Sequence, residues 1–247
     1  MHDTSSIVVV AAVALLLAGV VKGIVGLGLP TVAIGLLSVV MTPSEAAALL
    51  LVPTIVTNVW QLAMGPNLVA LTRRLWVMLA TSAPVTFIAA GFLAGSTERA
   101  SMALGVVLIC YAAIGLARIK LIAPAWSEPW LAPAIGVATG VVTGATGVMA
   151  LPAVAYFQAI GLDKEDMIQA LGLSFTVSML ALAGGLAREG VFHGSTFAAS
   201  LLALAPASVG MLAGQWVRLR IHPEIFRIYF LVGLLGLGAH LALRTVI

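Results

Sequence analysis

The sequence predicts an all-α polytopic membrane protein with two inverted repeats, each a broken, re-entrant helical segment followed by three transmembrane helices. Three observations predict this fold: the composition, the lengths of the apolar runs, and Gly and Pro residues that recur in both halves. Of 247 residues, 62% are hydrophobic and 9% are charged, whereas a soluble domain has about 25% charged residues. So few charges cannot cover a water-exposed surface, which excludes a soluble fold, a disordered chain and a nucleic-acid binder. We therefore expect a single transmembrane domain over residues 1–247.

Two of the apolar runs have an unusual length. The runs are 7–41, 44–64, 75–95, 101–117, 129–160, 167–187, 195–216 and 225–243. Six have the length of an ordinary span, about 20 residues. The first and the fifth would each be about 50 Å long as straight helices, against a hydrocarbon core of about 30 Å. The first run follows no Lys or Arg and precedes no small-residue cleavage site, so we expect it to be retained rather than removed as a signal peptide.

Both long runs contain Gly and Pro near their middle, in residues 23–30 and 144–152. In a helix interior Gly costs about 1 kcal/mol and Pro about 3 kcal/mol, so we expect breaks there. The two breaks match at a nearly constant offset: Gly23 with Gly144, Gly26 with Gly147, and Pro30 with Pro152. After each break a plausible N-cap, Thr42 or Asp163, precedes the next helix. The match predicts repeats at about 7–117 and 129–247.

The positive charges favour one topology. If each broken segment crosses fully, Lys and Arg divide evenly between the two sides. If each is a re-entrant hairpin, one side has three Arg (Arg99, Arg188 and Arg244), and the other, cytoplasmic side collects Arg73, Arg74, Arg118, Lys120, Lys164, Arg218, Arg220 and Arg227. Trp76, Trp126, Trp130 and Trp216 then share that interface. We prefer hairpins, which leave three crossings per half, invert the repeats and place both termini outside the cytoplasm; eight full crossings with two kinked helices is the alternative.

The breaks are the first candidate site. Backbone groups freed inside a membrane must be buried in protein or face a water-filled cavity, and helix N-termini there attract anions. We expect substrate binding at Gly23, Gly26, Gly28 and Pro30, and at Thr143, Gly144, Thr146, Gly147 and Pro152. Alternatively, glycines only permit close helix packing. We favour that interpretation for Gly91, Gly95, Gly136, Gly140, Gly210 and Gly214.

Lys22 is the one basic residue deep within an apolar run, and it adjoins the first break. A charge at mid-membrane is costly and is usually functional or paired. Every acidic residue within the predicted repeats lies at a segment end, so an anionic substrate is a candidate counter-ion. The alternatives are a lysine that snorkels to the interface, or one paired with Glu45 or another helix-end acid.

The second helix of each half carries polar residues in apolar sequence. Thr54, Asn58 and Gln61 recur at i, i+4 and i+7, on one helical face. The second half has Ser174 with Gln169, Thr176 and Ser178. Neutral donors can bind an oxyanion without a buried fixed charge; the alternative role is hydrogen bonding between helices. We include Thr54, Asn58, Gln61 and Ser174 in the predicted site.

Other chemistries lack their motifs. The sequence has no HExxH, no Cys cluster and no nucleotide-binding Gly loop, so we expect no enzyme, no metal and no cofactor. The middle of the predicted spans contains no acidic residue, which also disfavours a carboxylate relay for protons or sodium.

The chain resembles the sulfite exporter TauE/SafE family, also called the toluene sulfonate uptake permease family, over nearly its whole length. The stretch KGIVGLGLPTVAIGLL is similar to the opening Gly-rich motif of the family, and LLLVPTIVTNVWQ to its following helix. GATGVMALPAVAYFQAIGLDKEDMIQALGLSFTVS is similar to the second copy. The resemblance implies a bacterial inner-membrane transporter of sulfite, organosulfonates such as sulfoacetate, or related small anions. It also implies export, and a site at the two breaks and the polar faces.

The leading hypothesis is a secondary transporter that exports a small sulfur-containing anion by alternating access. Its expected partners are that anion and the lipid bilayer, with no nucleic acid, and a homodimer is left open. The alternatives are a passive anion channel and a membrane-embedded assembly subunit without transport.

Overall fold

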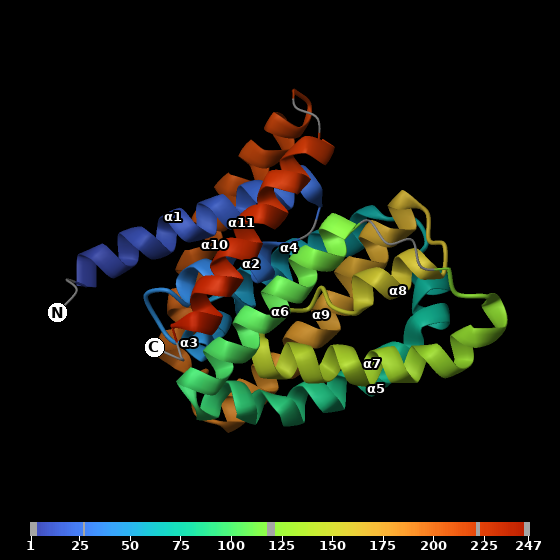
Figure 1. Ribbon diagram of the computed structural model, residues 1–247, viewed down its shortest axis with the longest axis horizontal. Coiled ribbons are helices and arrows are strands. Elements are labelled where there is room, and N and C mark those ends of the chain that lie inside the picture. The colour runs from blue at the N-terminus through green and yellow to red at the C-terminus, as the bar shows by residue number, and fades with distance from the viewer. Residues whose placement is uncertain (1–3, 27, 118–121, 221–222, 245–247) are drawn as a thin grey trace.

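The structure is a computed structural model, and it describes residues 4–26, 28–117, 122–220 and 223–244. These residues form an all-α bundle (Figure 1). The helices are α1 (Thr4–Val25), α2 (Leu29–Leu37), α3 (Pro43–Leu49), α4 (Leu51–Met64), α5 (Leu68–Gly95), α6 (Thr97–Ala117), the short 3-10 helix η1 (Ala125–Ser127), α7 (Glu128–Thr146), α8 (Ala153–Ala159), α9 (Lys164–Arg188), α10 (Gly194–Arg218) and α11 (Pro223–Leu243).

Both long apolar runs are broken, as predicted. The first divides into α1 and α2, and the second into α7 and α8. The matching glycines Gly26 and Gly147 follow the last turns of α1 and α7 with φ of 86° and 73°. Only glycine adopts this left-handed region at little cost, so these residues end the helices at the predicted places.

The two expected N-caps are confirmed. The Thr42 side chain accepts a hydrogen bond from the Glu45 backbone, and Glu45 reaches back to the Thr42 backbone in a capping box. The Asp163 side chain accepts from the backbone of Asp166 at the start of α9. Each cap satisfies amides that the first turn leaves without a partner, and so fixes where the helix after each broken segment begins.

The predicted span 44–64 is not one straight helix. It is the pair α3 and α4, which bend by 48° at Leu50. Pro53, in the first turn of α4, has no N–H to continue the ladder from α3. Within the described ranges, six helices are long and apolar enough to cross a membrane, namely α1, α5, α6, α9, α10 and α11; counting the bent pair as one span makes seven.

The helices of the two halves pack on each other in matching pairs. Helix α1 lies along α10, and α7 lies along α5 (Figure 1); α4 packs on α9 and α6 packs on α11. In each of the first two pairs, the broken segment of one half contacts the penultimate helix of the other. This exchange is the arrangement that two inverted repeats would produce.

Glycines set the close approach of these pairs. A Cβ at Gly210 or Gly214 of α10 would collide with backbone carbonyls of α1, and one at Gly136 or Gly140 of α7 with α5. The packing interpretation is therefore confirmed at these four positions. The packing interpretation is wrong for Gly95, because a Cβ there meets nothing within 4 Å. At Gly91 the atoms nearest to a Cβ are side-chain atoms of Arg188 and Glu189 rather than the backbone of another helix.

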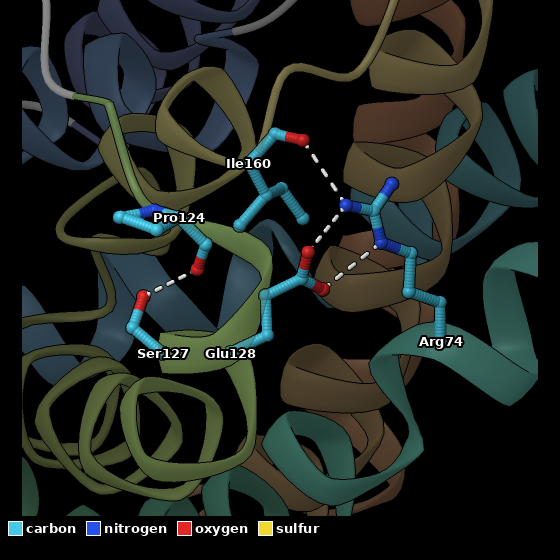
Figure 2. A network of polar contacts seen from close by, with 5 residues as sticks. All are labelled: Arg74, Pro124, Ser127, Glu128 and Ile160. Carbon is cyan, nitrogen blue, oxygen red and sulfur yellow. Dashed lines mark hydrogen bonds and ion pairs between the residues drawn. The ribbon is translucent and has the colours of Figure 1, made fainter.

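The two ends of the second broken segment meet at Arg74 of α5 (Figure 2). Arg74, in the second turn of α5, donates to both carboxylate oxygens of Glu128 at 3.0 and 2.6 Å and to the Ile160 carbonyl at 3.0 Å. Glu128 begins α7, and Ile160 directly follows α8. The backbone also joins the two ends, because Ala123 donates to the Ala159 carbonyl at 2.8 Å. A re-entrant hairpin requires this geometry.

The first broken segment returns at the opposite end. Val39, in the turn after α2, accepts a hydrogen bond from Arg244 after α11, and α1 begins toward that end in Figure 1. The Trp side chains assigned to the cytoplasmic interface are all exposed. Arg118 and Lys120, which were counted on that side, lie outside the described residues.

Candidate functional site

Lys22 lies in the last turn of α1 and is only 3% exposed. Its Nζ donates to Thr57 Oγ1 at 3.0 Å and to Asn58 Oδ1, and both acceptors are neutral side chains of α4. An ammonium group has three donors, so one N–H is left for a further acceptor. The burial contradicts the alternative in which Lys22 snorkels to the interface.

No carboxylate neutralises Lys22 within the described part of the chain, where the ion pairs are Arg74–Glu128 and Arg188–Glu189. Glu45, the other suggested partner, accepts hydrogen bonds from the backbone and side chain of Thr42 instead. A buried cation is costly unless a negative charge or several hydrogen bonds compensate it. The surroundings of Lys22 therefore suit a ligand that brings the negative charge.

The polar face of α4 that the spacing predicted meets the end of α1. Gln61 Nε2 donates to the Gly26 carbonyl at 2.7 Å, one turn beyond the contact of Asn58 with Lys22. Thr54 and Asn58 are fully buried, and Thr54 Oγ1 and Asn58 Nδ2 have no hydrogen-bond partner. Buried polar atoms are normally paired, so these two are available donors beside the buried Lys22.

The N-terminus of α2 lies on the other side of the first break. Gly28 is its N-cap with φ of 106°, no side chain caps it, and Pro30 occupies the first turn. Helix N-termini carry a partial positive charge and unpaired N–H groups. The first break thus brings Lys22, the donors of α4 and a positive helix end together.

The second break is neutral, and its threonines Thr143 and Thr146 bond within their own segment. Thr146 Oγ1 donates to the Val142 carbonyl at 2.7 Å and accepts from the Val148 backbone at 3.2 Å. Thr143 Oγ1 is buried, with a long bond of 3.4 Å to the Val148 carbonyl. A Cβ at Gly147 would reach the side chains of Ile34 and Ala47. The second break therefore lies against α2 and α3 of the first half.

Gly23 and Gly144 lie inside their helices rather than in the breaks. A Cβ at Gly23 would collide with the Met211 carbonyl of α10, and one at Gly144 with the Thr86 carbonyl and Ala89 of α5. Both glycines therefore permit close packing. Pro152 is the N-cap of α8.

Ser174 lies on α9, which packs on α4. Gly172 lets the two backbones approach, since a Cβ there would touch the Asn58 carbonyl at 3.0 Å. Ser174 and Ser178 are fully buried, and their hydroxyls have no partner. Gln169, in contrast, binds the α4–α5 turn through Leu62, Gly65 and Asn67, and Thr176 bonds to its own helix.

Comparison with known proteins places the chain in a family. The family model described as Sulfite exporter TauE/SafE matches residues 11–241. The chain belongs to the TauE/SafE family. No curated protein and no solved structure matches the chain. As a family member with six or seven candidate spans, it is a multi-pass membrane transporter of the sulfite or sulfonate type.

Sequence reasoning missed several residues of this TauE/SafE transporter. Thr57 was not assigned to the site, although it accepts a hydrogen bond from Lys22. Thr86 and Thr139, on the packed helices α5 and α7, have buried hydroxyls without a partner. Polar residues in apolar helices were the available signal for all three. Sequence reasoning assigned Arg74 only a part in the topology and assigned Ser200 none, because the contacts of both join distant segments.

Proposed function

We propose that the chain is a secondary transporter that exports sulfite or an organosulfonate such as sulfoacetate across the bacterial inner membrane by alternating access. The observation that carries this proposal is the buried Lys22, which has two neutral partners on α4. Among the described residues it has no carboxylate partner. A small anion would complete the charge balance of this site.

The chemistry of the donors fits a sulfur oxyanion. Sulfite and sulfonates carry negative charge on three oxygens arranged about one sulfur. The third N–H of Lys22, Asn58 Nδ2 and Thr54 Oγ1 are three donors of different geometry. The N-terminus of α2 adds unpaired backbone donors and a favourable dipole. Charge-assisted hydrogen bonds of this kind are stronger than those between neutral groups.

The packing of the halves supports alternating access. Transporters with inverted repeats place the substrate at broken helices and rock one unit against the other. Here the second break lies against α2 and α3 of the first half through Gly147. A relative movement of the halves would therefore change the surroundings of the first break as well.

Flux measurements on purified protein in proteoliposomes test the proposal. Vesicles loaded with labelled sulfite, sulfoacetate or methanesulfonate are diluted into buffer, and efflux is compared with that from protein-free vesicles. We expect saturable flux of at least one of these anions, counterflow against its concentration gradient when the opposite side holds unlabelled anion, and no flux of a cation such as choline. Flux that never runs against a gradient would identify a passive channel, and no flux of any anion would refute transport by this chain.

A further inference from the structure

A proline interrupts the helix that carries the donors of the site. In a continuous helix the amide of residue 53 would donate to the carbonyl of residue 49. Pro53 has no N–H, so the Leu49 carbonyl loses this partner at the junction of α3 and α4. The Val52 amide lies in the first turn of α4, where amides also lack helical partners. Leu50 and Leu51, between them, are 0% and 1% exposed, so water does not supply the missing bonds.

Ser200 of α10 supplies both of them. Its hydroxyl donates to the Leu49 carbonyl at 2.8 Å and accepts from the Val52 amide at 2.9 Å. Ser200 is fully buried and belongs to the other half of the chain. One side chain thus replaces the hydrogen bonds that the proline-containing junction cannot make, and it does so at the point where the chain bends by 48°.

The bend determines where the donors of α4 lie. Thr57 is one turn after Pro53, and its hydroxyl donates to the Pro53 carbonyl at 2.7 Å while it accepts from Lys22. Asn58 is the next residue. A change in the angle between α3 and α4 would therefore move Thr57 and Asn58 relative to Lys22.

Helix α10 also holds the lysine. Gly210 and Gly214 of α10 approach the carbonyls of Leu16 and Val20 so closely that no Cβ fits, and Lys22 is two residues beyond Val20. The same helix thus fixes α1 through its glycines and the start of α4 through Ser200. Both sides of the contact between Lys22 and Asn58 are held by α10.

We propose that Ser200 is a positioning residue for the anion site: it stabilises the bend at Pro53 and thereby fixes the position of the α4 donors relative to Lys22. The proposal rests on the proposed function, because the site it positions is the proposed anion site. It predicts that the hydroxyl matters only while Pro53 is present. An alanine at position 53 restores the N–H, so the Leu49 carbonyl regains a partner within its own helix.

A double-mutant cycle tests this dependence. Ser200→Ala is measured alone and together with Pro53→Ala, with Ser208→Ala as the control, a half-buried serine on the same helix. We expect Ser200→Ala to raise the KM for the transported anion about tenfold, the usual effect of losing a buried hydrogen bond, with a much smaller change in kcat. In the Pro53→Ala background the same substitution should change KM less than about twofold.

Hydrogen exchange of residues 49–58 provides a readout that does not require transport. Ser200→Ala should accelerate exchange there in the Pro53 protein and not in the Pro53→Ala protein. Equal effects in both backgrounds, by either readout, would overturn the proposal, as would a Ser200→Ala protein that behaves like the Ser208→Ala control. Failure of the unmodified protein to move any anion would instead refute the proposed function, and the exchange data would still decide the role of Ser200 at the bend.

Discussion

The two broken segments have the same architecture and different chemistry. In the first, Lys22 precedes Gly23 and reaches across to Thr57 and Asn58 of α4. In the second, the matching position before Gly144 is Thr143, whose hydroxyl stays within its own segment. The first break contains a buried cation and donors without partners, whereas the threonines of the second bond within their own segment.

The second segment is instead held by its ends. Arg74 of α5 binds both Glu128 and the Ile160 carbonyl, which ties the start of α7 to the end of α8 (Figure 2). A duplicated architecture therefore does not imply two equivalent sites. We infer that the first break provides the charge that binds the substrate and that the second provides a closely packed frame.

Removal of the charge should have the largest effect. We expect Lys22→Met to lower the initial rate of sulfite flux in proteoliposomes about 100-fold or more, since loss of a buried charge that binds a charged ligand costs several kcal/mol. The matched control is Thr143→Val at the equivalent position, which should change the rate less than about threefold, the effect of one weak hydrogen bond. Comparable losses in the two variants would show that the breaks share the binding role.

A fixed counter-ion should compete with the substrate. Asn58→Asp places a carboxylate where the Lys22 ammonium already bonds. We expect the KM for the transported anion to rise about 30-fold because the positive charge is neutralised within the protein, while the thermal unfolding midpoint in detergent does not fall. Asn58→Leu, which removes the acceptor without adding charge, should by contrast lower the thermal unfolding midpoint. An Asn58→Asp protein with an unchanged KM would show that Lys22 does not bind the substrate.

Close packing should matter equally in both halves. Gly23→Ala and Gly144→Ala each introduce a Cβ into the backbone of a neighbouring helix, and we expect each to lower the free energy of unfolding by about 1–3 kcal/mol. Gly95→Ala, where a Cβ meets nothing within 4 Å, should leave the thermal midpoint nearly unchanged. A large loss in only one of the two would break the structural equivalence of the repeats.

Removal of the Arg74–Glu128 ion pair should have the smallest effect. The side chains of Arg74 and Glu128 are 39% and 19% exposed, and such pairs contribute at most about 1 kcal/mol. Arg74→Gln should therefore lower the thermal midpoint by about 2–4 °C, and Glu128→Gln should add little in the Arg74→Gln protein. Arg73→Gln, at the neighbouring exposed residue, is the control. Additive losses from Arg74→Gln and Glu128→Gln would mean that the pair does not act as a unit.

Local sequence chemistry predicted much of the fold correctly. The helix breaks at Gly26 and Gly147 and the caps at Thr42 and Asp163 depend on backbone conformations and hydrogen bonds within a few residues. Their causes can therefore be read from adjacent residues. The sequence also singled out Lys22 and the spacing of Asn58 and Gln61, because polar groups are costly in an apolar segment.

The sequence did not predict how α4 begins. Pro53 lies in the interior of the predicted span 44–64, where a proline kinks or breaks a helix, but its presence does not give the angle or the neighbour that binds the freed carbonyl. The structure adds the 48° bend and the residue that binds the Leu49 carbonyl there, Ser200, which is 151 residues away. The ion pair between Arg74 and Glu128 was likewise not predicted, since charged residues at helix ends usually face water.

By itself, the sequence determined that this chain belongs in a membrane, where its helices break and which buried group carries a charge. Composition, glycine conformation and the cost of an unpaired lysine are properties of single residues or short segments. The tertiary structure alone decided that Lys22 meets Thr57 and Asn58, that the two breaks differ in charge and partners, and that α10 holds both sides of the site. These facts depend on which distant helices pack together. A glycine permits a close approach, but the glycine alone does not identify the helix that approaches it.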